Sequence, residues 1–168
     1  MNKMEVDIMN LKLLKLLANN ARYKVSELAT MLGISEDEVI LETAKLENEG
    51  LIRGYKAVVD WEKLNTAAVS ALIELKVSPQ ADYGFEEIAK RVMMYPEVET
   101  VYLMSGGYDL CVMVKGKTFQ EVAMFVAKEL STIDAVMSTA THFILRRYKE
   151  LDVILCDNEN DDRGSLSL

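Results

Sequence analysis

Histidine, cysteine and proline are scarce in this sequence of 168 residues, which holds one histidine, two cysteines and two prolines. His142 has no second histidine with which to bind a metal, and Cys111 and Cys156 form no paired-cysteine motif, so a structural zinc site is not expected. The same scarcity leaves no Ser/His/Asp or Cys/His arrangement for nucleophilic catalysis. We therefore predict no metal, no cofactor and no enzymatic activity.

Long apolar segments are also missing. The longest, residues 67–75, is interrupted by Ser70 and Glu74, and it is much shorter than the roughly 20 residues of a membrane-spanning helix. Residues 1–5 contain no hydrophobic signal core, so we expect a cytoplasmic protein without a membrane partner. Half of the residues are nonetheless apolar, which is enough for the core of one large domain or two small ones.

Positive charge is in deficit. The chain has 19 lysines and arginines against 27 aspartates and glutamates, a net charge of −8. DNA-binding proteins usually carry a basic face, because neutralising phosphates supplies much of their affinity. The acidic balance therefore counts against DNA as a partner unless the charges are unevenly distributed.

The first 60 residues have the pattern of a winged helix-turn-helix domain. Apolar residues at three- and four-residue spacings predict three helices, over residues 5–18, 26–32 and 35–49. Gly33 is the expected left-handed turn residue between the last two, and Ser35 with Glu38 forms the S-x-x-E capping box of a helix start. Short apolar runs at 51–56 and 57–60 predict a two-stranded wing. A linker is expected at 61–66.

The remainder alternates between strand and helix periodicity in the order βαββαβ. We predict strands at residues 67–77, 98–104, 108–115 and 136–148, and helices at 83–95 and 118–130. Two helices on one face of a four-stranded antiparallel sheet make a ferredoxin-like sandwich, so the fold class is α+β, with this second domain at 67–150. Six acidic residues against Arg163 in the last 19 residues predict a solvated acidic tail at 151–168.

Several motifs lie in the order and spacing of a known family. They are residues 25–35 (VSELATMLGIS), 46–55 (LENEGLIRGY), 59–60 (VD) with Leu64, 96–98 (PEV), 106–110 (GGYDL) and 139–141 (TAT). Over roughly residues 4–150 the chain resembles the Lrp/AsnC family of transcriptional regulators. This resemblance implies homodimers formed through the sandwich, or tetramers and octamers built from them. It also implies a small-molecule effector, typically an amino acid, and double-stranded DNA read by the third helix.

The third predicted helix departs from the family, which usually carries arginines or lysines at its middle. Here Ile40, Leu41 and Glu42 occupy that place, and residues 35–49 hold six acidic residues and one lysine. Contacts to DNA are therefore expected from Ser35 and Lys45 of this helix and from the basic residues on either side of it, Arg22, Lys24, Arg53 and Lys56. The alternative is a sensor or interaction module of the same family that has lost DNA binding and uses Ile40 and Leu41 for protein contact. An enzyme on the same fold is a third reading.

The effector site is expected at the glycine-containing hairpin between the second and third sheet strands. Gly106 and Gly107 permit positive φ and the close approach of a ligand. The Asp109 carboxylate could take an ammonium group while backbone N–H groups take a carboxylate. The predicted ligand-binding residues are Ser105, Gly106, Gly107, Tyr108, Asp109, Thr139 and Thr141. The alternative is a plain hairpin turn with threonines chosen for their strand propensity.

Overall fold

The computed structural model describes residues 7–64, 68–78 and 84–156. The chain divides into two compact units, residues 1–57 and 58–168. Parts of several predicted segments lie outside the described residues: the starts of the helices at 5 and 83, the start of the strand at 67, the linker residues 65 and 66, and the tail beyond 156. No helix in the described part of the chain is long and apolar enough to cross a membrane.

The N-terminal unit contains three helices, α1 (Ile8–Asn19), α2 (Val25–Leu32) and α3 (Glu36–Asn48). Each helix buries one face in a shared core, whose buried residues are Leu13, Leu28, Ala29, Val39 and Leu46. Val39 and Leu46 are seven residues apart and therefore lie on the same side of α3. The predicted helix-turn-helix is confirmed, and this burial decides which face of α3 is turned outward.

The predicted two-stranded wing is wrong. Among residues 51–60 the structure contains no strand, and most of these side chains, including Leu51 and Val59, are exposed. An isolated two-stranded hairpin is marginally stable unless one of its faces is buried. Here Ile52 packs against the helical core, and the N–H groups of Leu51 and Ile52 donate to the Leu46 carbonyl, so the start of the segment is tied to α3 and forms no strand.

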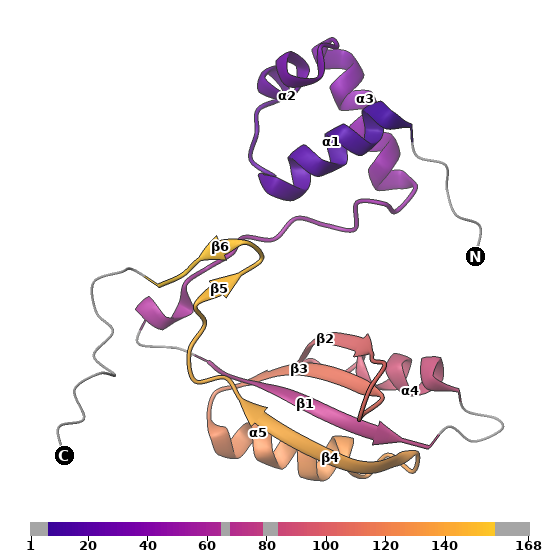
Figure 1. Cartoon of the computed structure of the whole chain (residues 1–168), viewed down its shortest axis with the longest axis vertical. Helices are drawn as coiled ribbons and strands as arrows, with labels where there is room; N and C mark the ends of the chain where they lie inside the picture. The colour runs from indigo at the N-terminus through magenta and orange to yellow at the C-terminus, as the bar shows by residue number, and fades with distance from the viewer. Residues whose placement is uncertain (1–6, 65–67, 79–83, 157–168) are drawn as a thin grey trace. The chain divides into compact units, whose positions relative to one another are not determined.

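The C-terminal unit is a four-stranded antiparallel sheet with helices on one face (Figure 1). Its elements are β1 (Val69–Val77), α4 (Phe85–Val92), β2 (Val98–Leu103), β3 (Leu110–Gly116), α5 (Phe119–Phe125), the π-helical turn η2 (Val126–Leu130) and β4 (Val136–Phe143). The strand order is β2-β3-β1-β4. This is the predicted ferredoxin-like βαββαβ arrangement, and the prediction is confirmed.

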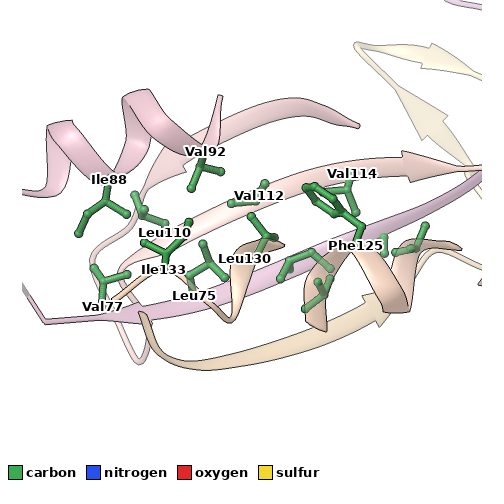
Figure 2. Close-up of a cluster of buried hydrophobic side chains, with 14 of the residues drawn as sticks. Leu75, Val77, Ile88, Val92, Leu110, Val112, Val114, Phe125, Leu130 and Ile133 are labelled. Carbon is green, nitrogen blue, oxygen red and sulfur yellow. The ribbon is translucent and has the colours of Figure 1, made fainter. Parts of the chain in front are cut away.

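The core of this unit lies between the helices and one face of the sheet. Alternate residues of β1 and β3 point toward the helices, and Figure 2 shows Leu75, Leu110 and Val112 there with Val92 of α4 and Phe125 of α5. The intervening residues, such as Leu72, Glu74 and Met113, lie on the other face. Within the described part of the C-terminal unit, no helix of that unit covers the second face. Its β4 residue His142 is exposed, with Nε2 3.3 Å from Glu74 Oε1.

The end of the described chain forms a small hairpin that the sequence did not predict. The last strand of the main sheet ends at Phe143, not at residue 148, and β5 (Lys149–Glu150) then pairs with β6 (Val153–Ile154). Leu151 and Asp152 both have positive φ, the backbone of the tight turns that suit hairpins. The predicted acidic tail therefore does not begin at 151, because backbone pairing extends to Ile154.

The predicted linker contains a turn of 3-10 helix, η1 (Trp61–Lys63). The Asp60 side chain caps this turn by accepting from Glu62 N–H at 3.2 Å. Glu62 in turn accepts a hydrogen bond from the Arg147 backbone N–H at 2.8 Å. These bonds join the start of the C-terminal unit to the segment that follows β4.

Candidate functional site

The turn between α2 and α3 sets the geometry of the helix-turn-helix. Gly33 ends α2 with φ +71°, and its N–H donates to the Ala29 carbonyl at 2.8 Å. A side chain at this φ would be strained, although there is open space around the position, so the left-handed backbone is the reason for glycine here. Ala29 is 7% exposed, and its small side chain suits a close crossing of the two helices.

The first turn of α3 is fixed by the capping box that the sequence predicted. Ser35 Oγ accepts from Glu38 N–H at 3.2 Å, while Glu38 Oε2 accepts from Ser35 N–H at 2.8 Å and from the Ser35 hydroxyl at 2.7 Å. The bond from the Ser35 backbone N–H, followed by that from its hydroxyl, lowers the pKa of Glu38. The Ser35 hydroxyl proton is thus directed at Glu38, and contact of Ser35 with DNA stays a prediction.

The basic candidates for DNA contact are all exposed. Arg22 and Lys24 lie in the segment that leads into α2, and Lys24 occupies the N-cap position. Lys45 on α3 has Nζ 3.7 Å from Glu42 Oε2. The Arg53 side chain lies over Gly50, just beyond the end of α3. A Cβ atom placed on Gly50 would lie only 3.0 Å from the guanidinium carbon of Arg53. The fifth basic candidate, Lys56, lies three residues further along the chain.

One contact that holds the segment after α3 was not predicted. The Tyr55 hydroxyl donates to Glu47 Oε1 at 2.8 Å. Partial burial is the main cause that raises the pKa of Tyr55, and this hydrogen bond to a carboxylate is the second. The bond keeps residues near Arg53 and Lys56 close to α3 and also engages one of the helix's acidic side chains. Sequence alone gave no sign of it, since tyrosine and glutamate eight residues apart have no local reason to meet.

Asp109 holds the end of β1. Its Oδ2 accepts from the Val77 backbone N–H at 2.8 Å, and its own N–H donates to the Leu75 carbonyl at 3.0 Å. Val77 is 5% exposed, so without this carboxylate its N–H would be a poorly solvated donor. Asp109 therefore has a structural role, which the sequence did not indicate.

The glycine-containing loop does not use the conformational freedom predicted for it. Neither Gly106 nor Gly107 is among the residues with positive φ, and a Cβ atom at either would contact nothing within 4 Å. The Gly107 carbonyl accepts from Lys76 Nζ at 3.4 Å, and Ser105 beside the glycines is exposed. In the protomer this loop is an open turn, and a ligand's approach to it stays a prediction.

The other predicted ligand-binding residues point to opposite faces of the sheet. Tyr108 interacts with Cys111, whose side chain lies on the face without helices, and burial raises the pKa of both groups. Thr139 and Thr141 pair with Leu75 and Ile73 of β1, whose side chains are buried beneath the helices. A single protomer therefore does not bring Tyr108 and the two threonines to one site.

A cavity of about 450 Å³ lies elsewhere in the C-terminal unit, between α4 and the segment that leads into β4. Its apolar floor includes Ile88 and Ile133, and its charged residues include Glu87, Arg91 and Asp134. None of the seven predicted ligand-binding residues is among its described lining residues. The sequence did not indicate it, because α4 and residues 133–135 meet only in the folded unit.

A capped helix-turn-helix joined to a ferredoxin-like unit is the architecture of a two-domain transcriptional regulator. Residues 6–47 match the family model of the AsnC-type helix-turn-helix domain, and residues 70–154 match that of the Lrp/AsnC ligand binding domain. The chain belongs to the Lrp/AsnC family, as its motifs indicated. It is a transcriptional regulator.

Similar proteins agree with this assignment. The chain is 42% identical over 153 residues, 90% of its length and 92% of the relative's, to an uncharacterized HTH-type transcriptional regulator, YugG, of Bacillus subtilis. It is 28% identical to the regulatory protein AsnC of Haemophilus influenzae, over 81% of this chain and 89% of that one. Its fold matches the transcriptional regulator NMB0573 in complex with L-Met from Neisseria meningitidis, with a TM-score of 0.69, 24% identity and coverage of 87% and 94%.

Proposed function

We propose that this regulator binds double-stranded DNA through α2 and α3, and that an amino acid bound to its ferredoxin-like unit changes that binding. The observation that carries the first half is the capped α3, whose buried residues Val39 and Leu46 turn its opposite face to solvent. The second helix of a helix-turn-helix reads the major groove with such a face. A regulator of this kind acts where the chromosome lies, which we take to be the cytoplasm.

The acidic composition of residues 35–49 is less unfavourable for DNA binding than their net charge of −5 suggests. Glu38 is bound to Ser35, Glu47 accepts from Tyr55, and Glu42 is half-buried beside Lys45. Arg22, Lys24, Arg53 and Lys56 are exposed at the two ends of the motif. These four residues, with Lys45 and Ser35, are our candidates for contact with DNA.

The effector is proposed to be an amino acid because the structure of the Neisseria meningitidis regulator includes L-Met and another relative is the regulatory protein AsnC. Its site is proposed at the loop between β2 and β3. Asp109 Oδ2 is engaged by Val77 N–H, but a carboxylate can accept several hydrogen bonds and so could also take an ammonium group. Because Tyr108 and Thr139 lie on opposite faces of one sheet, a complete site would need residues from a second protomer.

A homodimer is proposed through the face of the sheet that has no helices. Leu72 and Met113 are half-buried there, while Tyr102 is 58% exposed. A sheet with helices on one side leaves its other face in need of cover, and a second copy would supply it. Tetramers or octamers built from this dimer would bring further loops together. Sedimentation velocity at micromolar concentration tests the proposal, and a monomer there would overturn it.

DNA binding is tested by selecting duplexes from a random library at about 50 mM salt and measuring their affinity by fluorescence anisotropy. Enrichment of a sequence supports the proposal, and failure to enrich any duplex would overturn it. The variants Lys24→Ala and Arg53→Ala should weaken binding to all sequences. Each should also reduce the slope of log affinity against log salt by about 0.9 if one phosphate contact is lost. Lys149→Ala, an exposed cation in the C-terminal unit, is the matched control.

The effector site is tested with the twenty amino acids at millimolar concentration, by the change in DNA affinity that each causes. Asp109→Asn retains an acceptor for the Val77 N–H but removes the charge, so it should abolish the response and leave the fold intact. Asp134 lines the cavity beside α4, away from the proposed site. The Asp134→Asn variant should therefore show the same amino-acid-dependent change in DNA affinity as the wild type. If the Asp134 variant loses the response while the Asp109 variant keeps it, the effector binds in that cavity and the hairpin site is wrong.

A further inference from the structure

The outward face of α3 is apolar at its centre. Counting from the buried Val39 and Leu46, the opposite side of a helix with 3.6 residues per turn is formed by Asp37, Ile40, Leu41, Ala44 and Asn48. Ile40 is 55% exposed and Leu41 is 66% exposed, although both belong to residue types that are usually buried. The bonds and ion pair described above place Glu38, Glu42 and Glu47 away from the middle of this face.

Each base pair presents different chemistry in the major groove. Guanine is read by arginine or lysine, cytosine by acceptors and adenine by asparagine or glutamine, whereas the 5-methyl group of thymine is read by apolar side chains. The outward face of α3 carries no arginine, and Lys45, the lysine of this helix, lies beside Glu42. Apart from Lys45, which lies at one edge of this face beside Glu42, the middle of α3 presents Ile40, Leu41 and Ala44, whose apolar chemistry matches the thymine methyl group.

We infer that Ile40, Leu41 and Ala44 read thymine methyl groups in the major groove and set the sequence preference of this regulator. This inference rests on the proposed DNA binding and adds which base the third helix recognises. Affinity comes from the basic residues at the ends of the motif, which contact phosphates regardless of sequence. Discrimination comes from burial of methyl groups against the two aliphatic side chains. The preferred duplex carries thymines where the middle of α3 enters the groove.

The test replaces thymine with deoxyuridine in the duplex selected from the random library, one position at a time. This substitution removes the methyl group and leaves base pairing unchanged. Loss of one buried methyl group corresponds to about a fourfold loss of affinity at each contacted thymine, and a duplex in which two contacted thymines are replaced together should lose roughly fifteenfold. Positions outside the reach of α3 should show no change and serve as the control within the same duplex.

The variants Ile40→Ala and Leu41→Ala assign the effect to the helix. Both side chains are exposed, so the core around Val39 and Leu46 should be unaffected, which thermal unfolding verifies. Each variant should bind the thymine duplex several-fold more weakly and should discriminate less between thymine and deoxyuridine. Ile8→Ala, which removes an aliphatic side chain 74% exposed on α1, should behave as the wild type does.

The outcomes of these experiments distinguish failure of the thymine inference from failure of the proposed DNA binding. If a duplex is selected but deoxyuridine is tolerated everywhere, DNA binding stands and the thymine inference is overturned. If Ile40→Ala and Leu41→Ala leave both affinity and discrimination unchanged, this face does not enter the groove, and a protein partner becomes its expected occupant. If no duplex is enriched, the proposed DNA binding itself is wrong.

Discussion

Replacing Asp109 with alanine removes the acceptor that binds the Val77 N–H where β1 ends. The Oδ2 to N distance is 2.8 Å and Val77 is 5% exposed, so the freed N–H would have little access to water. A buried donor left without a partner costs about 1–3 kcal/mol. We therefore expect Asp109→Ala to lower the free energy of unfolding by about 2 kcal/mol, and Asp109→Asn to lower it by less, because the amide oxygen still accepts.

Calorimetry and circular dichroism of the full chain measure this effect. In a domain of about 100 residues, 2 kcal/mol corresponds to a drop in melting temperature of roughly 10 °C. Asp134→Ala is the matched control, because this exposed aspartate precedes β4 and makes no hydrogen bond or ion pair among the described residues. A melting temperature of Asp109→Ala equal to that of the wild type would refute the reasoning that the carboxylate supports the end of β1.

Three further predictions concern the helices and the sheet core. Ser35→Ala should destabilise the N-terminal unit by about 1 kcal/mol through loss of the α3 cap. Chemical denaturation followed by helical circular dichroism measures this loss, and an unchanged midpoint would contradict it. The lowered pKa of Glu38 means that its contribution to stability is present above the ordinary glutamate pKa of 4.5 and is lost as pH falls through the lower folded value. A titration of stability between pH 6 and about pH 3 should therefore show a fall that is smaller in Glu38→Gln. Leu75→Ala should cost about 2–5 kcal/mol, because Leu75 is fully buried beneath the helices; a smaller loss in denaturant unfolding would mean that the core collapses around the gap.

Local patterns were sufficient for most of the fold. The periodicity of Val39 and Leu46 identified the inner face of α3, and the Ser35 and Glu38 pair identified its first turn, because capping depends on residues three apart. The order of strand and helix periodicity likewise predicted the βαββαβ arrangement of the sheet domain. These signals act over a few residues, so they can be read before any tertiary contact is known.

The sequence was a poorer guide to the effector site. It placed Tyr108, Thr139 and Thr141 in one group, but strand register puts both threonines on the face beneath the helices, whereas Tyr108, in the loop before β3, interacts with Cys111 on the other face. A side chain's face depends on strict alternation along each strand, and the relation between two strands depends on their pairing. Neither quantity follows from a motif, and the same limit explains why the structural role of Asp109 was missed.

Helix starts, the turn glycine and the order of strands and helices are local properties of this chain, and its amino-acid sequence determined them. Contacts between distant segments were decided by the fold. Tyr55 bonded to Glu47, α4 and residues 133–135 came together to line an open cavity, and residues 149–154 formed a hairpin. The expected wing did not form among the described residues, where Ile52 packs on the helical core and Tyr55 bonds to α3; such contacts across the fold are not visible in a short apolar run.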